Sequence, residues 1–351
     1  MPHWVSVSRF ASNGRDLSRP YKGIRLKRLT RLLSILLVLV GLAGLPLFAQ
    51  DQPPPTDESG LDAVPAGTPI PLPTRGARPA SYLITENDRA QLHFFFQALP
   101  QGTTALMRVV GAEIANARAL FVGDLIDFFP VEDDFYGLIA VGMEQATGRE
   151  NALAVYITFT DGSRTTLEAN VEIVQGSFIR QQVTLAPDKG YLLDTETEQS
   201  ELARLESMLT GYEQERRWDE TGFQLPIPAA LTSPFGAFRT FNGTLNTRHT
   251  GWDIRTTLGQ PVLASAAGRV VFAGMLPIRG NYVLIDHGYG VFTGYAHFST
   301  THVTRGLDVA KGQVIGTTGD TGRTSGPHFH WELAVNGDWV DSVQFVELWM
   351  P

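Results

Sequence analysis

The sequence contains no cysteine among its 351 residues. This absence excludes disulfide bonds, thiolate metal sites, a cysteine nucleophile and a lipid-modified N-terminal cysteine. Any metal bound by this chain must therefore use histidine and carboxylate ligands. The absence does not by itself fix the cellular compartment.

Basic residues are scarce beyond the first 31 positions. Residues 1–31 carry eight Lys or Arg side chains and one acid, which leaves 20 basic and 35 acidic side chains, a net charge of −15, for the other 320 residues. A region with this excess of acidic side chains has no net electrostatic attraction to a polyanion. We therefore expect no nucleic-acid partner.

The basic residues 1–31 form an n-region or a cytoplasmic tail, and they run directly into an apolar stretch at 32–49. This pattern indicates an export signal. A helix of that length would be roughly 27 Å long, which is short for a membrane core of about 30 Å, and Ala49 suits a signal peptidase. We favour a cleaved signal peptide, with a membrane anchor as the alternative, and expect the remainder to be exported in either case.

Glycine and proline are abundant, with 35 and 21 residues, while charged residues make up only 18% of the chain. This balance favours short strands and turns, so we predict a mainly β protein. Residues 50–79 are a proline-rich linker, and residues 80–176 are predicted to form a small β-sandwich domain of Ig-like type. The clearest hairpin turns at Asp161-Gly162. His93 is expected to be a satisfied core or edge residue.

Residues 177–225 are predicted to form a connector with one helix at about 195–210. Thr195 and Glu198 have the spacing of a capping box, and the leucines that follow recur on one face. We expect the acidic residues on the other face to be solvated.

Six of the eight histidines lie beyond residue 248, in a glycine-punctuated region at 226–351. His249 and Asp253 lie four residues apart. In the predicted strand around His328-Phe329-His330, alternation places the two histidines on the same face. Two imidazoles and one carboxylate make an open three-ligand set for Zn²⁺. The four candidates leave one histidine over, which would lie beside the metal together with His297.

Hydrolysis at such a zinc ion needs a group that takes a proton from water and returns it to the leaving amine. The sequence has no His-Glu-x-x-His helix, so histidine must do this work. His297 and the histidine left over are the available groups.

The region from about 226 to 351 resembles the lysostaphin and LytM-type zinc endopeptidases, a family that mostly cleaves peptides of bacterial peptidoglycan. Besides the His-x-x-x-Asp and His-x-His elements, the resemblance rests on motifs that follow one another in the family's order. These are Ser233-Pro234-Phe235-Gly236, Pro261-Val262 with Ala267-Gly268, Gly280-Asn281 with Asp286-His287-Gly288, Tyr295-Ala296-His297, and Gly316-x-x-Gly319-x-Thr321-Gly322.

The resemblance implies that His249, Asp253 and His330 bind one Zn²⁺ per chain, while His297 and His328 are catalytic. It also implies an antiparallel β-sheet domain with a groove, and peptidoglycan peptides as substrate. We expect a monomer in the extracellular space or cell envelope, with membrane contact only through an uncleaved residue 32–49 segment. Some family members have a tyrosine shortly before the first ligand, and this chain has none between 236 and 249.

Two other functions remain open. The chain could be a non-catalytic cell-wall-binding or hydrolase-regulating module, or a zinc protease that acts on secreted proteins. Two further histidines are not expected to bind metal: His287, predicted to be a surface or supporting residue in a hairpin turn, and His302, predicted to lie in a solvated loop.

Overall fold

The computed structural model describes residues 73–351, which belong to one compact unit. The predicted n-region at 1–31, the apolar segment at 32–49 and residues 50–72 of the linker lie outside the described residues. Within 73–351, no helix is both long enough and apolar enough to cross a membrane.

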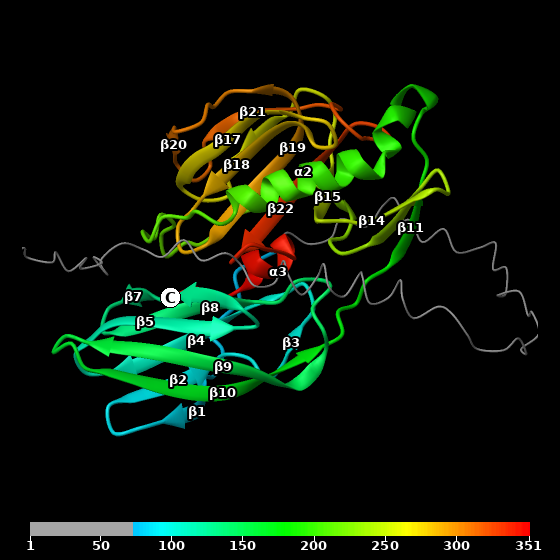
Figure 1. Ribbon diagram of the computed structural model, residues 1–351. Coiled ribbons are helices and arrows are strands. Elements are labelled where there is room, and N and C mark those ends of the chain that lie inside the picture. The colour runs from blue at the N-terminus through cyan, green and yellow to red at the C-terminus, as the bar shows by residue number, and fades with distance from the viewer. Residues whose placement is uncertain (1–72) are drawn as a thin grey trace, which may run out of the picture. The chain divides into compact units, whose positions relative to one another are not determined.

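The structure is mainly β, as the glycine and proline content predicts (Figure 1). The helical elements are η1 (Pro187–Leu193), α2 (Thr195–Met208) and α3 (Ser342–Glu347). The strands are β1 (Tyr82–Glu86), β2 (Ala90–Phe94), β3 (Leu99–Pro100), β4 (Thr104–Gly111), β5 (Ile114–Phe121), β6 (Asp124–Asp127), β7 (Phe129–Val131), β8 (Asp134–Ala140), β9 (Gly148–Phe159), β10 (Arg164–Val174), β11 (Arg180–Val183), β12 (Leu231–Ser233), β13 (Phe238–Phe241), β14 (Leu245–Arg248), β15 (Gly251–Arg255), β16 (Pro261–Leu263), β17 (Gly268–Leu276), β18 (Gly280–Asp286), β19 (Val291–Thr301), β20 (Asp308–Val309), β21 (Val314–Thr318), β22 (His328–Val335) and β23 (Asp338–Val340).

Strands β1 to β10 form two five-stranded sheets, with the orders β1-β2-β4-β8-β7 and β3-β10-β9-β5-β6. Apolar side chains of both sheets share one buried core, in which Leu92 of the first sheet and Val155 of the second are fully buried. The predicted hairpin is confirmed, because β9 and β10 pair antiparallel on either side of Asp161-Gly162. The Ig-like type of this sandwich stays a prediction.

The second sheet system has ten strands, of which seven follow the order β12-β15-β22-β19-β18-β17-β20. Every pairing in it is antiparallel. Alternation along β18 buries Val283 and Ile285 on one face and Leu284 on the other. Leu205 and Leu209 pack on the face of Leu284, so α2 covers that face of the sheet (Figure 1).

The predicted helix at 195–210 is confirmed as α2, but its cap and the burial of one of its acidic residues differ from expectation. Asp194 is the N-cap, and its carboxylate accepts a 2.8 Å hydrogen bond from Thr197 N in place of the predicted capping box at Thr195. Glu201 differs from the solvated acids expected on the other face, because it lies four residues before Leu205 on the packed face and is 3% exposed. The buried Arg279, which lies outside the helix, pairs with this carboxylate.

The connector also contributes a strand beside the large sheet. β11 pairs in parallel with β13, which pairs antiparallel with β14, and these three strands form a small separate sheet. The register places Gln181 of β11 opposite Arg239 of β13. β11 of the connector is thereby placed next to β13, which precedes the first predicted metal ligand, His249, in the sequence.

Candidate metal centre

Strands β15 and β22 bring two predicted ligands directly opposite each other. The antiparallel register pairs Asp253 with His330, and His249 lies two residues before β15 begins. At Gly251, an added Cβ would lie 2.3 Å from the carbonyl oxygen of Trp331. Glycine at this position therefore allows β15 to run close to β22 and to present its carboxylate to the neighbouring strand.

Alternation along β22 separates polar from apolar side chains. Phe329 and Trp331 are fully buried in the core of the large sheet. His328, His330 and Glu332 point to the opposite face. The predicted strand and the shared face of the two histidines are confirmed.

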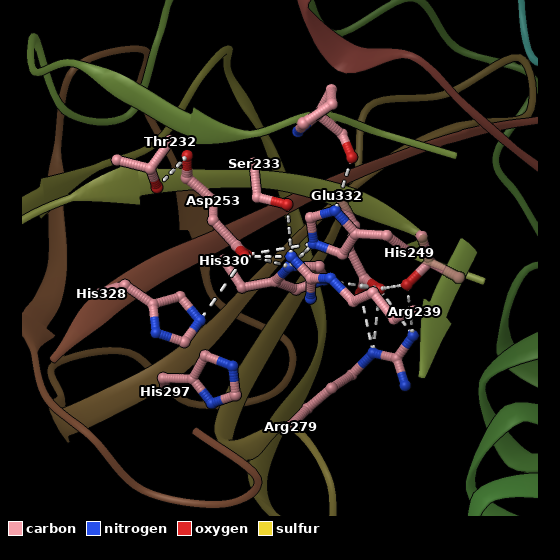
Figure 2. Close-up of polar contacts among 12 residues, drawn as sticks. Thr232, Ser233, Arg239, His249, Asp253, Arg279, His297, His328, His330 and Glu332 are labelled. Carbon is pink, nitrogen blue, oxygen red and sulfur yellow. Dashed lines mark hydrogen bonds and ion pairs between the residues drawn. The ribbon is translucent and has the colours of Figure 1, made fainter. Parts of the chain in front are cut away.

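Three of the predicted site residues converge on one point (Figure 2). His249 Nε2 lies 3.1 Å from Asp253 Oδ1 and 3.0 Å from His330 Nδ1, and His330 Nδ1 lies 3.0 Å from the same carboxylate oxygen. All three side chains are buried. Such a cluster needs a positive charge or a proton among its atoms.

The neighbours of the two rings indicate which nitrogens carry protons. His249 Nδ1 lies 2.7 Å from the carbonyl oxygen of Pro234, which can only accept, so Nδ1 donates and the Nε2 lone pair faces the cluster. Burial lowers the pKa of His249 to about 4, which keeps the ring neutral. His330 Nε2 lies 3.1 Å from Glu332 Oε1, and its Nδ1 faces the cluster.

This donor set fits a zinc ion, which binds neutral imidazole nitrogens and carboxylate oxygens. Burial lowers the pKa of His330 while hydrogen bonds to Asp253 and Glu332 raise it, and the net change is an increase. A bound cation would take the place of that proton. The carboxylates that favour a proton on His330 also favour a cation there.

His297 and His328 lie beside the cluster with their ring centroids 4.8 Å apart (Figure 2). His297 Nδ1 lies 2.7 Å from the carbonyl oxygen of Thr321, and His328 Nδ1 lies 2.9 Å from that of Gly326. Because carbonyl oxygens can only accept, each Nδ1 carries the hydrogen and each Nε2 is left with a lone pair. His328 Nε2 is 3.6 Å from Asp253 Oδ1.

The backbone of His297 has a φ of +61°, in the left-handed region that is unusual for a side-chain-bearing residue. Its amide donates a 2.9 Å hydrogen bond to the carbonyl oxygen of Arg279, which helps to hold this conformation. Burial and the nearby rings of His328 and His330 hold the pKa of His297 well below its ordinary value. The ring is therefore a neutral base at neutral pH.

Arg239 is a site residue that no sequence motif marks. Its guanidinium pairs with Asp253 Oδ2 and donates a 2.7 Å hydrogen bond to Ser233 Oγ. Burial raises the pKa of Asp253, but Arg239 and His249 outweigh this effect and hold it well below its ordinary value. Asp253 thus uses one oxygen for Arg239 and keeps the other for the cluster.

Glu332 and Arg279 form a second supporting pair. Arg279 Nε donates to both carboxylate oxygens of Glu332 at 3.0 and 2.9 Å, and Tyr282 donates its hydroxyl to Glu332 Oε2 at 2.8 Å. Burial would raise the pKa of Glu332, which is 0% exposed, but Arg279 and His330 hold it well below its ordinary value. Strand alternation from His330 could have identified Glu332, whereas no sequence signal marked Arg279.

The five predicted site residues line one groove of about 580 Å³. Its walls come from the small sheet, from α2 and from the loop that precedes β22. The lining includes Gln181, Gln182, Glu198, Ser233, Arg239, Arg248, His249, Asp253, Arg279, His297, Arg323, Gly326, Pro327, His328 and His330. His302 does not line the groove and is exposed after β19, as predicted. His93 lies in β2 of the sandwich, where its Nδ1 has no hydrogen-bond partner.

His287 lies outside the cluster of metal-ligand candidates, as predicted, but the surface position, one of the two expected for it, is wrong. It follows β18 in the expected turn, but it is 0% exposed. Its Nδ1 lies 2.8 Å from the carbonyl oxygen of Ala267, and its Nε2 lies 2.7 Å from Thr293 Oγ1. Both ring nitrogens are thus satisfied inside the protein, which explains how an imidazole can be buried here.

Because His287 is buried, we expect the protein to lose stability in acid. Burial lowers the pKa of His287 to about 4 from 6.5, so between these values the unfolded chain binds the additional proton. The contribution of His287 to the free energy of unfolding should therefore be constant above pH 6.5 and should decrease by about 3 kcal/mol as the pH falls to 4, in addition to the decreases caused by the buried His249 and His297. Urea unfolding at a series of pH values, with chelator present throughout, measures this decrease.

The matched variant for this measurement is His287→Gln, which keeps a donor and an acceptor but does not titrate. We expect its unfolding free energy to depend less steeply on pH than that of the wild type. Equal slopes in the two proteins would show that His287 does not cause the acid sensitivity.

Comparison with known proteins identifies relatives of this region. Residues 247–342 match the family described as Peptidase family M23. The chain is 44% identical over 96 residues to the peptidoglycan DD-endopeptidase ShyA of Vibrio cholerae, a match that covers 27% of this chain and 22% of that protein. It is 41% identical over 129 residues to the DD-carboxypeptidase/endopeptidase Mpg of Neisseria meningitidis, with 36% and 29% covered. The chain thus spans less than a third of the length of these relatives.

A solved structure shows a similar fold over a larger part of the chain. It is a crystal structure from Pseudomonas aeruginosa that is described as a peptidase M23, with a TM-score of 0.53 and 23% sequence identity. The match covers 71% of this chain and 94% of the other. At this identity the likeness concerns the fold alone.

Proposed function

We propose that this chain, whose residues 247–342 match peptidase family M23, is an exported zinc-dependent endopeptidase that hydrolyses peptide bonds of bacterial peptidoglycan. The observation that carries the proposal is the convergence of three lone-pair atoms in a groove that also presents two further histidines with free Nε2 atoms. The named activities of the relatives from Vibrio cholerae and Neisseria meningitidis support peptidoglycan as the substrate.

In this proposal His249 Nε2, Asp253 Oδ1 and His330 Nδ1 hold one zinc ion. Three protein ligands leave a coordination position open, which is typical of catalytic rather than structural sites. A zinc ion held there supplies Lewis-acid chemistry, which polarises a peptide carbonyl and lowers the pKa of water.

His297 and His328 move the protons in this proposal. Each ring is fixed by its Nδ1 hydrogen bond to a backbone carbonyl, so each Nε2 can accept a proton from water and return it to the leaving amine. The chain has no tyrosine between residues 236 and 249. Stabilisation of the negative charge that develops on the substrate oxygen would therefore fall to a bound zinc ion and to a protonated His297 or His328.

The proposal extends to the remainder of the chain. Residues 226–351 are the catalytic domain, residues 177–225 the connector, and residues 80–176 a separate sandwich domain. The basic and apolar segments at 1–31 and 32–49 direct export, which would bring the protein to the cell envelope or the extracellular space. We propose that it acts there as a monomer.

Metal removal tests the proposal. Purified protein should clear a peptidoglycan suspension, lose this activity on treatment with a chelator and regain it with added zinc. The reason is that hydrolysis in this proposal requires a zinc ion held by the three ligands. Mass spectrometry of the released muropeptides would identify the bond that is cleaved. Activity that survives complete zinc removal would contradict the proposal. Zinc-loaded protein that binds peptidoglycan without releasing muropeptides would instead identify a binding module.

A further inference from the structure

Two segments of the connector, both outside residues 247–342, reach the residues that support the metal cluster. β11 contributes Gln181, which lies on the Arg239 side of the cluster. α2 contributes Glu201, which lies on the Arg279 side. The two contacts come from different elements and lead to different ligands, so they are independent observations.

Glu201 is a buried carboxylate with a complete set of partners. Its oxygens accept hydrogen bonds from Ile278 N at 2.6 Å and from Arg279 N at 3.1 Å, and Arg279 Nη1 donates to it at 3.0 Å. A buried charge requires such compensation. This anchoring of the backbone at 278–279 explains why an acidic residue of α2 faces inward.

Arg279 links Glu201 to the ligand His330. The guanidinium lies between two buried carboxylates, with Glu201 on one side and Glu332 on the other. Glu332 Oε1 in turn lies 3.1 Å from His330 Nε2. A carboxylate that accepts from the second nitrogen of a ligating histidine fixes the ring orientation and raises its basicity. The position of Glu332 depends on Arg279, whose position depends on Glu201.

Gln181 is linked to the ligand Asp253 through Arg239, as Glu201 is linked to His330 through Arg279 and Glu332. Its Oε1 accepts a 2.7 Å hydrogen bond from Ser233 Oγ and a 3.3 Å hydrogen bond from Arg239 Nε. Arg239 then pairs with Asp253 Oδ2 and leaves Oδ1 to the cluster. Figure 2 shows Arg239, Arg279 and Glu332 around the converging ligand atoms.

We propose that Glu201 and Gln181 are positioning residues of the zinc site, so that the connector is a functional part of the metal centre. The proposal rests on the proposed function, because it requires zinc at His249, Asp253 and His330. Neither residue touches the ion; each acts through one arginine. A catalytic domain that begins at residue 226 would then lack Gln181 and Glu201, which support its metal site.

Zinc affinity of the full chain, measured by competition with a chromophoric chelator, tests the role of Glu201. We expect Glu201→Gln to weaken zinc binding about tenfold, the lower end of the range for groups behind metal ligands. Glu196→Gln is the matched control, because Glu196 is an exposed acid on the same helix. The control should bind zinc as tightly as the wild type.

A double variant separates positioning from a general loss of stability. If Glu201 acts through Glu332, the change Glu201→Gln should cost much less zinc affinity in a Glu332→Gln background than in the wild type. Independent effects would instead multiply, and that result would contradict the chain of contacts through Arg279.

Gln181 provides a test that does not depend on the folding of the Glu201 variants. Gln181→Met removes the acceptor and should weaken zinc binding, whereas Gln181→Glu keeps it and should retain binding. If wild type binds zinc but Glu201→Gln and Gln181→Met bind it equally well, the inference is wrong and the proposed function stands. If wild type itself binds no zinc, the proposed function fails first.

Discussion

Replacement of His330 by alanine is expected to remove zinc and hydrolytic activity together. His330 Nδ1 is one of the three converging donors, and its Nε2 contacts Glu332. Its loss leaves only His249 and Asp253 of the three converging donors. We expect zinc affinity to fall more than about 100-fold, beyond the range for residues that only support a ligand.

Metal analysis after dialysis, together with a muropeptide-release assay, measures both losses in the His330→Ala protein. His302→Ala is the matched control, since His302 is exposed and lies outside the groove. It should keep one zinc per chain and full activity. A His330→Ala protein that retains stoichiometric zinc would exclude His330 from the ligand set.

Replacement of His328 by alanine is expected to abolish hydrolysis while the protein retains its zinc. His328 lies on the same face of β22 as His330, but its Nδ1 is engaged by the carbonyl oxygen of Gly326 and its Nε2 lies 3.6 Å from Asp253 Oδ1. Loss of a positioned general acid or base costs about 10²- to 10⁴-fold in rate. We expect a decrease in kcat of this size.

Steady-state kinetics and zinc analysis on the same His328→Ala preparation test this expectation. His297→Ala should behave alike, because its Nδ1 is likewise held by a backbone carbonyl oxygen and its ring lies beside that of His328. Near-normal kcat in His328→Ala would remove this residue from the reaction. Loss of zinc from the same protein would mean that His328 is a ligand.

The fold was predictable where local pattern and packing agree. Val155, Ile157 and Phe159 alternate with less apolar neighbours before a turn dipeptide, so β9 and its hairpin follow from the sequence. β5 has no comparable local pattern, because Ala115, Ala117 and Ala119 have low strand propensity, and β9 on one side and β6 on the other hold that strand in the sheet. In β5, tertiary pairing outweighs local preference.

The supporting residues of the site were the least predictable part. Glu201 lies four residues before Leu205, on the packed face of α2, but only its contact with Arg279, 78 residues further along the chain, makes burial of its charge favourable. Arg239 and Arg279 carry no local motif. A long side chain on a strand or a loop gives no indication of which distant carboxylate it will meet.

By itself, the sequence determined the donor chemistry and the alternation that places His328 and His330 on one face of a strand. The absence of cysteine limits metal ligands to histidine and carboxylate, and strand geometry repeats every two residues whatever the fold. Only the tertiary structure decided that the Nε2 of His249, the Nδ1 of His330 and one oxygen of Asp253 face a common point. Which atom of a side chain faces the site depends on hydrogen bonds with other segments, such as that of His249 with Pro234 and that of Asp253 with Arg239, and sequence spacing does not encode these contacts.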